Sequence, residues 1–543
     1  MEELNILNFN DNYDIEKDDG NIEYKRELTN LDNDTFNKRV TQMKYRLCEG
    51  VGEAFYFIGV NDDGTLNELS EAEYIESEYN LKKIADEINC SVIKIQESNK
   101  NNKFIGKFLI RENNKNNYIN INISIAGNVD AGKSTIIGVL TRGILDDGKG
   151  KSRLHVFNYK HEIDTGRTSS ISQQIMGFSD NGDVISTKYD NIHNWSDIIN
   201  QSTKLIYFYD LAGHKKYLKT TIFGLTSLCS DYCLILINAN SGINHMTMEH
   251  IGICINLKIP FIIVVTKMDI TPINIINETM TKINNICKNK IKKTSYIIKN
   301  ITDVINIAKN IKNNSLVPII QVSSVTGYNI DLLKKLLNLM PQRNNYQQNN
   351  NKHIELVIAD TYSVIGHPLI ISGMLKSGTI RPNNNLLIGP FHDLSYRQVK
   401  VRSMHLNCKN INEGVSGNYL CISLKGITRK EIRKGMILIT DDNSLKIAIK
   451  RFIAEVYVLH STTTIKEGYQ PFVHIEHVRQ TIKIIEINKF NAKDLNDKHL
   501  RTGDKANVKF EFIIRPEYIK VGMHLIAREG NIKLYGKITE IIG

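Results

Sequence analysis

Residues 121–140 read INISIAGNVDAGKSTIIGVL, and this stretch decides how the rest of the chain is interpreted. A strand-like run ends at Gly127, a helix-compatible run follows Lys133, and the letters between match the pattern G-x-x-x-x-G-K-[ST]. Glycines in this pattern let backbone N–H groups surround a phosphate at a helix N-terminus. The pattern predicts that Lys133 reaches the β- and γ-phosphates and that the Ser134 hydroxyl binds Mg²⁺. The residues expected at the nucleotide are Gly127, Asn128, Val129, Asp130, Ala131, Gly132, Lys133, Ser134 and Thr135.

Around this stretch, short apolar strands alternate with helical patterns, which predicts a parallel sheet covered by helices. The preceding region mixes helical and alternating segments, as is typical of a small α+β domain. After the sheet region helical patterns nearly disappear, and short alternating runs separated by turns predict β-barrels. The predicted segments are an acidic disordered lead (1–20), an α+β domain (21–117), a nucleotide-binding α/β domain (118–342), a polar linker (343–352) and two β-barrels (353–444 and 445–543).

The composition favours a cytoplasmic protein that binds polyanions. The 543 residues carry a formal net charge of +11, although the first 36 hold 11 acidic and only 3 basic side chains, so the remainder is more basic still. Nucleic acid is the commonest partner of a protein with such a basic region. A lysine-biased genome is the alternative source of the charge.

Membrane and secretory classes are disfavoured by the sequence. The longest apolar runs, such as IPFIIVVT, fall short of the roughly 18 residues that a membrane span needs. The start lacks the basic and then apolar order of a signal peptide. Eight scattered cysteines contain no Cys-x-x-Cys pair, which favours reduced thiols in the cytoplasm.

A second motif, DLAGH, follows the apolar run LIYFY. Asp210 ends this predicted strand, where a carboxylate can hold Mg²⁺ through water, and Gly213 allows a backbone N–H to approach the γ-phosphate. His214 follows at once and is predicted to orient the attacking water, the role that a glutamine has in small signalling GTPases.

The choice of guanine over adenine is predicted by TKMD, which closes the strand PFIIVV. The carboxylate of Asp269 can accept two hydrogen bonds from the guanine N1–H and N2–H₂ edge. The Lys267 stem can cover the base, and Thr266 lies at the strand end. The later strand PIIQVSS ends at Ser323 and Ser324, which are predicted to contact the guanine oxygen or to form a simple turn.

The segment HEIDTGRTSSIS, residues 161–172, lies between these motifs. A switch segment at this place offers a hydroxyl to Mg²⁺ while the γ-phosphate is present and releases it after hydrolysis. Thr168 is the predicted ligand, with Thr165, Ser169 and Ser170 as alternatives. The predicted metal set is therefore Ser134, Thr168 and Asp210.

Taken together, GNVDAGKST, DLAGH and TKMD, followed by two β-barrels, resemble the translational GTPases of the elongation factor Tu and one-alpha class. HEIDTGRTSS, DLAGHKKYLKTTIFGLTS and LRTGDKA are similar to a narrower group, the GTP-binding protein 1 and 2 family, and TQMKYRLCEGVGEAFYFIGV is similar to the extra N-terminal domain of that family. The resemblance begins at about residue 21 and covers nearly all of the chain that follows.

The resemblance implies a GTP- and Mg²⁺-dependent enzyme that acts with the ribosome and aminoacyl-tRNA, with family links to RNA-decay machinery. It places the family's switch threonine on Thr168 and its catalytic histidine on His214. Tyr217 and Lys219 fall where elongation factors contact the 5′ end of tRNA. The third-domain surface that faces the tRNA stem is placed on His474, Arg479 and Gln480.

Three departures from elongation factor Tu stand out. Ala212 replaces a proline, which leaves φ unrestricted and restores a backbone N–H in the second switch. Thr266 replaces an asparagine, so its link to the phosphate loop is in question. Arg167 replaces an apolar residue, and we consider that it opens access to the histidine, supplies charge to the γ-phosphate, or faces solvent or tRNA.

The leading hypothesis is a monomeric GTPase that carries aminoacyl-tRNA or surveys stalled ribosomes, cycling between GTP and GDP. A second is a GTP-switched RNA-binding adaptor that links to mRNA decay through the exosome with little turnover. A third, a GTPase coupled to small-molecule activation such as sulfate adenylylation, predicts no RNA affinity and is disfavoured by the basic body.

Overall fold

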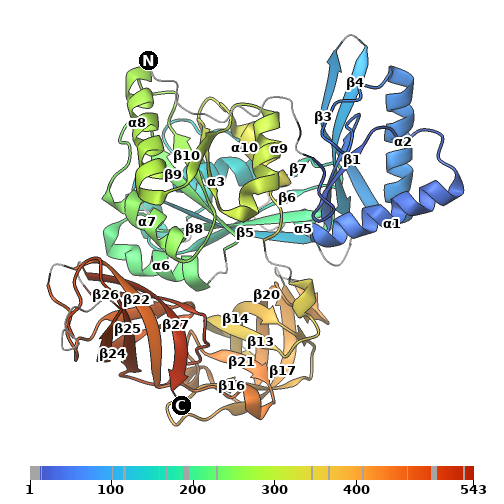
Figure 1. The fold of residues 1–543 in the computed structure, drawn as a ribbon. Coiled ribbons are helices and arrows are strands. Elements are labelled where there is room, and N and C mark those ends of the chain that lie inside the picture. The colour runs from blue at the N-terminus through green and yellow to red at the C-terminus, as the bar shows by residue number, and fades with distance from the viewer. Residues whose placement is uncertain are drawn as a thin grey trace. The chain divides into compact units, whose positions relative to one another are not determined.

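The computed structural model describes residues 13, 15–100, 102–113, 118–157, 159–166, 168–186, 195–227, 230–343, 346–364, 367–406, 409–461, 463–490, 498–529 and 532–542. The chain divides into two compact units, residues 1–218 with 230–344 and residues 219–229 with 345–543. The first unit contains an N-terminal α+β region and a larger α/β region (Figure 1). The second contains two β-barrels and nearly all of helix α6 (Leu218–Ser227). Most of the predicted acidic lead lies outside the described residues.

The N-terminal region is a sheet packed against two helices. Its strand order is β1-β2-β4-β3, with β1 parallel to β2 and the other neighbours antiparallel. Both helices begin at side-chain caps, since Asp32 accepts the N–H of Thr35 and Ser70 forms a capping box with Glu73. The bounds are β1 (Ile22–Lys25), α1 (Asn33–Glu49), β2 (Glu53–Ile58), α2 (Glu71–Glu87), β3 (Cys90–Lys100) and β4 (Lys103–Glu112).

A mixed sheet with the order β11-β12-β10-β9-β5-β8-β6-β7 forms the α/β region. Strand β5 is parallel to both β8 and β9, which confirms the predicted parallel sheet, while β6 and β7 add an antiparallel edge. Carboxyl ends of parallel strands meet at one edge, so the loops after Gly127, Asp210 and Thr266 lie together. The strand bounds are β5 (Ile119–Gly127), β6 (Ser172–Phe178), β7 (Val184–Ile185), β8 (Lys204–Asp210), β9 (Tyr232–Asn238), β10 (Phe261–Thr266), β11 (Thr294–Ile297) and β12 (Leu316–Gln321).

Helices cover this sheet and connect its strands. They are α3 (Lys133–Arg142), α4 (Lys160–Thr165), α5 (Trp195–Gln201), α7 (His245–Asn256), α8 (Ile273–Ile286), α9 (Ile301–Asn310) and α10 (Ile330–Leu339). Short turns of 3-10 type lie at η1 (Ser152–His155), η2 (Lys215–Tyr217) and η4 (Ile311–Asn313), and a π-type turn lies at η3 (Cys287–Ile291).

The two regions of the first unit share one hydrophobic core. Phe55 and Phe57 of β2 belong to the same buried cluster as Ile123 of β5 and Ile305 of α9. Burial of each such side chain contributes about 2 kcal/mol relative to exposure. The N-terminal region is therefore packed as part of the nucleotide-binding unit.

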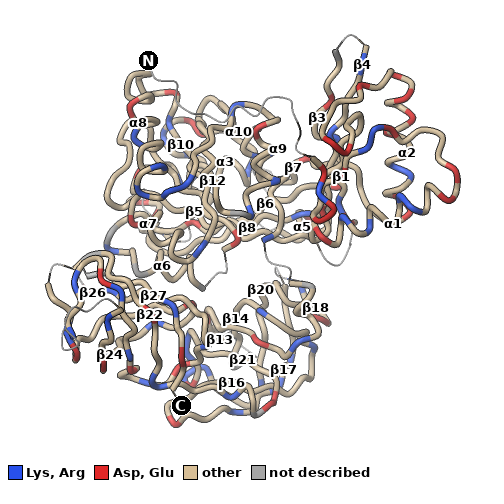
Figure 2. Tube along the Cα trace, viewed as in Figure 1, with Lys and Arg blue, Asp and Glu red and all other residues tan. Residues whose placement is uncertain are grey.

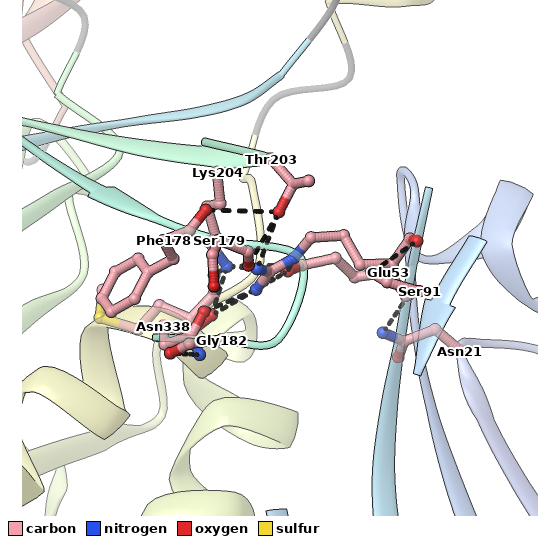
Figure 3. A network of polar contacts seen from close by, with 11 residues as sticks. Asn21, Glu53, Ser91, Phe178, Ser179, Gly182, Thr203, Lys204 and Asn338 are labelled. Atoms are coloured by element: carbon pink, nitrogen blue, oxygen red, sulfur yellow. Dashed lines mark hydrogen bonds and ion pairs between the residues drawn. The ribbon is translucent and has the colours of Figure 1, made fainter. Parts of the chain in front are cut away.

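A buried polar cluster also joins these two regions (Figure 3). Glu53 of β2 accepts hydrogen bonds from Arg111 Nε at 2.8 Å and from Lys204 Nζ at 2.9 and 3.0 Å. Lys204 Nζ also donates to the carbonyl oxygens of Asn338 and Met340, each at 2.6 Å. Arg111 Nη2 donates to Asn338 Oδ1 at 2.7 Å. Every charge in this cluster has a partner, as buried charges require.

The second unit contains the two predicted β-barrels. In the first barrel the order β16-β21-β13-β14-β20-β17 is closed by pairing of β16 with β17, around a core that includes Leu356 and Ile422. Its bounds are β13 (Glu355–Val364), β14 (His367–Ser377), β15 (Thr379–Ile380), β16 (Asn385–Gly389), β17 (Arg397–Leu406), β18 (Lys409–Ile411), β19 (Gly414–Val415), β20 (Tyr419–Lys425) and β21 (Ile437–Thr440), with short turns at η5 (Gln347–Asn349), η6 (Arg429–Glu431) and η7 (Asn443–Leu445).

The second barrel is closed in the order β22-β25-β24-β23-β26-β27. Phe452, Phe510 and Phe512 pack inside it with ring centroids 5.2 to 5.4 Å apart. Its bounds are β22 (Arg451–His460), β23 (Phe472–Ile475), β24 (Val478–Lys489), β25 (Lys505–Phe512), β26 (His524–Glu529) and β27 (Ile532–Ile542). The predicted fold class is thereby confirmed.

Charge is interspersed along the elements. Figure 2 shows both Lys and Arg and Asp and Glu dispersed over many of the drawn elements, so the positive excess does not come from one element. Among the described residues, no helix is long and apolar enough to cross a membrane.

Candidate functional site

The phosphate loop connects β5 to α3. The backbone at Gly127 and Gly132 has φ of +148° and +81°, values that side chains rarely tolerate. A Cβ on Gly127 would also lie 2.5 Å from the carbonyl oxygen of Leu236 on β9. Lys133 begins α3, and its Nζ donates to the carbonyl oxygen of Asn128 at 2.8 Å. Residues of this loop and the buried Lys133 line one small cavity, at the place where a phosphate binds such a loop.

The three predicted metal ligands converge. Ser134 Oγ lies 2.5 Å from Asp210 Oδ2, Thr168 Oγ1 lies 3.0 Å from the same oxygen, and the two hydroxyls are 2.9 Å apart. Asp210 Oδ1 is buried and has no hydrogen-bond partner among the described residues. Burial raises the pKa of Asp210, and Lys133 opposes this effect. Two hydroxyls and an under-coordinated carboxylate form an all-oxygen donor set that fits Mg²⁺.

The geometry distinguishes Thr168 from its three alternatives. Thr165 Oγ1 donates to the carbonyl oxygen of His161, on its own helix α4. Ser169 and Ser170 both use their hydroxyl and N–H groups on the carboxylate of Glu162, at 2.7 to 3.1 Å. Of the four, the structure places the hydroxyl of Thr168 on Asp210.

Glu162 is a site residue that the sequence reasoning missed. Its side chain is completely buried, and Oε1 accepts four hydrogen bonds from the two serines that follow Thr168. It thereby holds the switch segment in place. The available signal was an acidic residue within a segment rich in hydroxyl donors, since buried carboxylates need such partners.

At the base-binding end, Asp269 Oδ1 accepts a hydrogen bond from Ser323 Oγ at 2.7 Å. Thr266 Oγ1 donates to the carbonyl oxygen of Ala131 at 2.9 Å, so a threonine does link this motif to the phosphate loop. Lys267 has a φ of +61° and is half-buried beside the exposed Asp269. Ser324 lies next to Ser323 in the loop after β12, and its carbonyl oxygen accepts the N–H of Asp146.

The second switch follows β8. A Cβ on Gly213 would lie 2.5 Å from Lys133 Nζ and 2.7 Å from the Gly127 carbonyl oxygen, so this backbone packs directly on the phosphate loop. His214 lines the same cavity and is exposed, and its Nδ1 accepts the N–H of Lys216 at 3.1 Å. Ala212 is buried.

The residues assigned to tRNA contact have different environments. Tyr217 is half-buried beside His214, with ring centroids 6.3 Å apart, while the side chain of Lys219 and all of Arg167 lie outside the described residues. His474 and Gln480 are each 1% exposed, and Gln480 Nε2 donates to Glu517 within the barrel. The expected surface position therefore does not hold for these two. Gln480 pairs with Val473 of the barrel core and faces inward, whereas His474 pairs with Arg479 on the outer face of the strands and is nevertheless buried. The guanidinium of Arg479 stacks over Phe223 at 3.9 Å.

Similarity to known proteins identifies the family to which the chain belongs. The model of the elongation factor Tu GTP-binding domain matches residues 119–342. The chain is 38% identical to GTP-binding protein 1 of Xenopus laevis, over 93% of this chain and 76% of that protein. It is 37% identical to GTP-binding protein 2 of Mus musculus, over 97% and 88%. The chain belongs to the GTP-binding protein 1 and 2 family.

This family is one of translational GTPases, and solved structures share the fold. The elongation factor SelB of Methanococcus maripaludis, in complex with the GTP analogue GppNHp, has a TM-score of 0.55 at 18% identity, covering 78% of this chain and 80% of that one. The Ski7 GTPase-like domain of S. cerevisiae, bound to GTP, has a TM-score of 0.57 at 14% identity, covering 78% and 97%.

Proposed function

We propose that this protein binds GTP with Mg²⁺ and hydrolyses it to GDP and phosphate on the ribosome. The observation that supports this most directly is the convergence of Ser134, Thr168 and Asp210, since the first two line the cavity and both contact the carboxylate of the third. A hydroxyl from the phosphate loop, a hydroxyl from the first switch and a carboxylate from the second form the set that a nucleotide-bound Mg²⁺ needs. Asp269 supplies the acceptor for the guanine edge.

Each residue has a distinct chemical task in this proposal. Ser134, Thr168 and Asp210 would hold Mg²⁺, which neutralises charge on the phosphates when bound. Lys133 binds the β- and γ-phosphate oxygens. Because Nδ1 of His214 accepts a backbone N–H, the neutral ring carries its proton on Nε2. We expect this ring to orient the water that attacks the γ-phosphorus as the bond to the β–γ bridging oxygen breaks.

Family membership supports the biological setting that we propose. We expect a monomeric cytoplasmic factor that carries aminoacyl-tRNA or surveys stalled ribosomes, with Tyr217, Lys219 and Arg479 as candidate tRNA contacts. The similarity to elongation factor 1-alpha of Archaeoglobus fulgidus, which is 24% identical over 72% of this chain, supports a role in elongation. A GTP-switched adaptor with little turnover is the competing function, favoured by an N-terminal region that shares the core of the nucleotide-binding unit.

The proposed hydrolysis is tested with His214→Ala in single-turnover assays on ribosomes. We expect the rate to fall at least about a hundredfold, in line with loss of a residue that positions the nucleophile, while GTP affinity stays unchanged. His245→Ala is the matched control, because His245 is also exposed but lies at the start of α7. A wild-type rate in His214→Ala would overturn the assignment.

Two further readouts separate the competing functions. Negligible ribosome-stimulated turnover in the wild-type protein, with normal GTP binding, would favour the adaptor. GTP-dependent pull-down of aminoacylated over deacylated tRNA would favour delivery. Equal capture of both forms would favour surveillance.

A further inference from the structure

An arginine outside the recognised motifs also lines the phosphate cavity. Arg153 lies in the short turn η1, and its side chain borders the cavity together with Lys133, Thr168 and His214. None of the phosphate-loop, switch or base-recognition motifs includes this residue. Its guanidinium adds a permanent positive charge, next to the Lys133 ammonium, to a cavity built for phosphates.

The backbone that carries Arg153 is fixed relative to the phosphate loop. A Cβ on Gly138 would lie 2.2 Å from the carbonyl oxygen of Ser152, so helix α3 and turn η1 meet at backbone distance. The buried carboxylate of Asp146 accepts the N–H groups of Gly148, Gly150 and Ser152 at 3.0 to 3.1 Å. Turn η1 is thus held both by the helix that begins at the phosphate loop and by a carboxylate that satisfies its donors.

The side chain occupies a slot between two glycines. A Cβ on Gly150 would lie 2.5 Å from Arg153 Nε, and a Cβ on Gly166 would lie 3.0 Å from Arg153 Nη2. Both glycines have positive φ, +89° and +64°, which independently disfavours side chains there. Because Gly166 lies two residues before Thr168, the slot delivers the guanidinium next to the switch residue expected at the γ-phosphate.

Within the described part of the chain, no carboxylate forms an ion pair with Arg153 and no hydrogen bond of its guanidinium is found. Arg153 is half-buried, and its planar guanidinium can therefore offer two N–H donors to the oxygens of a phosphate. Aspartate side chains elsewhere in this loop bind backbone N–H groups instead.

We propose that Arg153 binds the terminal phosphate of GTP in cis. It then distinguishes GTP from GDP and stabilises the negative charge that develops on the γ-phosphoryl oxygens during hydrolysis. This inference rests on the proposed function for its catalytic part, but the distinction between GTP and GDP holds for a GTP-switched adaptor as well. Arg167, which the sequence suggested for this task, is not required by it.

The test compares Arg153→Ala and Arg153→Gln with the matched control Lys149→Ala. Lys149 is exposed in the same loop, and its backbone N–H bond to Asp147 survives the change. Equilibrium binding of fluorescent GMPPNP and fluorescent GDP is measured in Mg²⁺. Both Arg153 variants should bind GMPPNP about tenfold or more weakly, as expected for a lost charge-assisted pair, and GDP within about twofold of wild type. Retained GDP affinity shows that the site is folded.

Single-turnover hydrolysis at saturating GTP should fall about a hundredfold or more in the Arg153 variants, as for arginines that stabilise phosphoryl transfer. Unchanged GMPPNP affinity, or equal losses for both nucleotides in both variants, would overturn the inference. If the wild-type protein itself does not hydrolyse GTP on ribosomes, the proposed function fails while the nucleotide comparison still decides the role of Arg153.

Discussion

The two ends of strand β8 carry buried charges of opposite character. At its beginning, Lys204 Nζ meets both oxygens of Glu53 and two backbone carbonyl oxygens, and Arg111 completes the cluster. At its end, Asp210 shares one oxygen with Ser134 and Thr168 and leaves the other without a partner in the described structure. Both ends are equally buried, so burial alone does not distinguish them.

The difference lies in how completely the charges are satisfied. A buried cluster whose donors and acceptors are all used holds two regions of a fold together and has no capacity for a ligand. A buried carboxylate with a free oxygen, next to two hydroxyls, is destabilising by itself and gains its missing partner from a bound cation. The end of β8 whose buried carboxylate lacks a partner is therefore the functional end. The end whose buried charges all have partners is the structural end.

Replacing a carboxylate by the corresponding amide should have different effects on stability at the two ends of β8. Glu53→Gln leaves Arg111 and Lys204 buried without their counter-charge, and we expect it to lower the free energy of unfolding of the first unit by about 3 kcal/mol. Fluorescence of Trp195, the single tryptophan, reports this unit during a urea titration. Glu278→Gln is the control, since Glu278 pairs with Lys282 on the exposed face of α8. An unchanged urea midpoint in Glu53→Gln would show that the Glu53 cluster does not stabilise the first unit.

Asp210→Asn should leave the nucleotide-free protein at least as stable as the wild type, because it removes a buried charge with an unused oxygen. It should also lower single-turnover GTP hydrolysis at least about a hundredfold, equivalent to about 2.7 kcal/mol. Mg²⁺ should no longer strengthen GTP binding in this variant. A loss of stability in Asp210→Asn as large as that in Glu53→Gln would show that Asp210 also stabilises the fold and that the two ends of β8 do not differ in this respect.

The pH dependence of stability should contain a contribution from Lys204. Burial lowers the pKa of Lys204 to about 8 in the folded protein, although Glu53 opposes this effect, whereas an unfolded lysine has a pKa of about 10.4. Between these pH values the unfolded chain binds more protons, so the free energy of unfolding should rise with pH. Measured as wild type minus Lys204→Met, the rise should be about 2 kcal/mol between pH 8 and 10. A flat difference would show that Glu53 keeps the ammonium fully charged.

A smaller effect is expected at the link between base recognition and the phosphate loop. Thr266→Val removes the hydrogen bond to the carbonyl oxygen of Ala131, and we expect GTP and GDP affinities to fall alike by about fivefold, or about 1 kcal/mol. Thr281→Val is the control, because the Thr281 hydroxyl donates to the carbonyl oxygen of Asn277 within helix α8. Unaltered affinities would mean that the threonine is not needed to couple the two motifs.

Much of the site was predictable because its motifs are local. The phosphate loop begins where β5 ends, Asp210 ends β8, and Gly213 and Asp269 lie in the loops that follow β8 and β10, so strand prediction and motif position agree. Glu162 and Arg153 were not predictable in this way. Their partners or neighbours are brought together by turns such as those at Gly150 and Gly166, and no spacing rule in the sequence describes that approach.

The barrels show the same limit for surface residues. Short alternating runs predicted β-barrels correctly, because the side-chain period of a strand is two. In the register of β23 against β24, Gln480 pairs with the core residue Val473 and faces into the barrel, whereas His474 pairs with Arg479 on the opposite face. Both residues are buried, so their burial depends on tertiary packing at each face of the sheet and not on the local pattern.

By itself, the sequence determined the order of strands and helices, the phosphate and guanine motifs and the family, since these depend on patterns between near neighbours in the chain. Only the tertiary structure decided which hydroxyl meets Asp210, that Glu53 and Lys204 join the N-terminal region to the nucleotide-binding unit, and that Arg153 lines the phosphate cavity. These contacts join residues far apart in the chain, and their free energy depends on burial and on the pairing of charges, which exist only once the chain has folded.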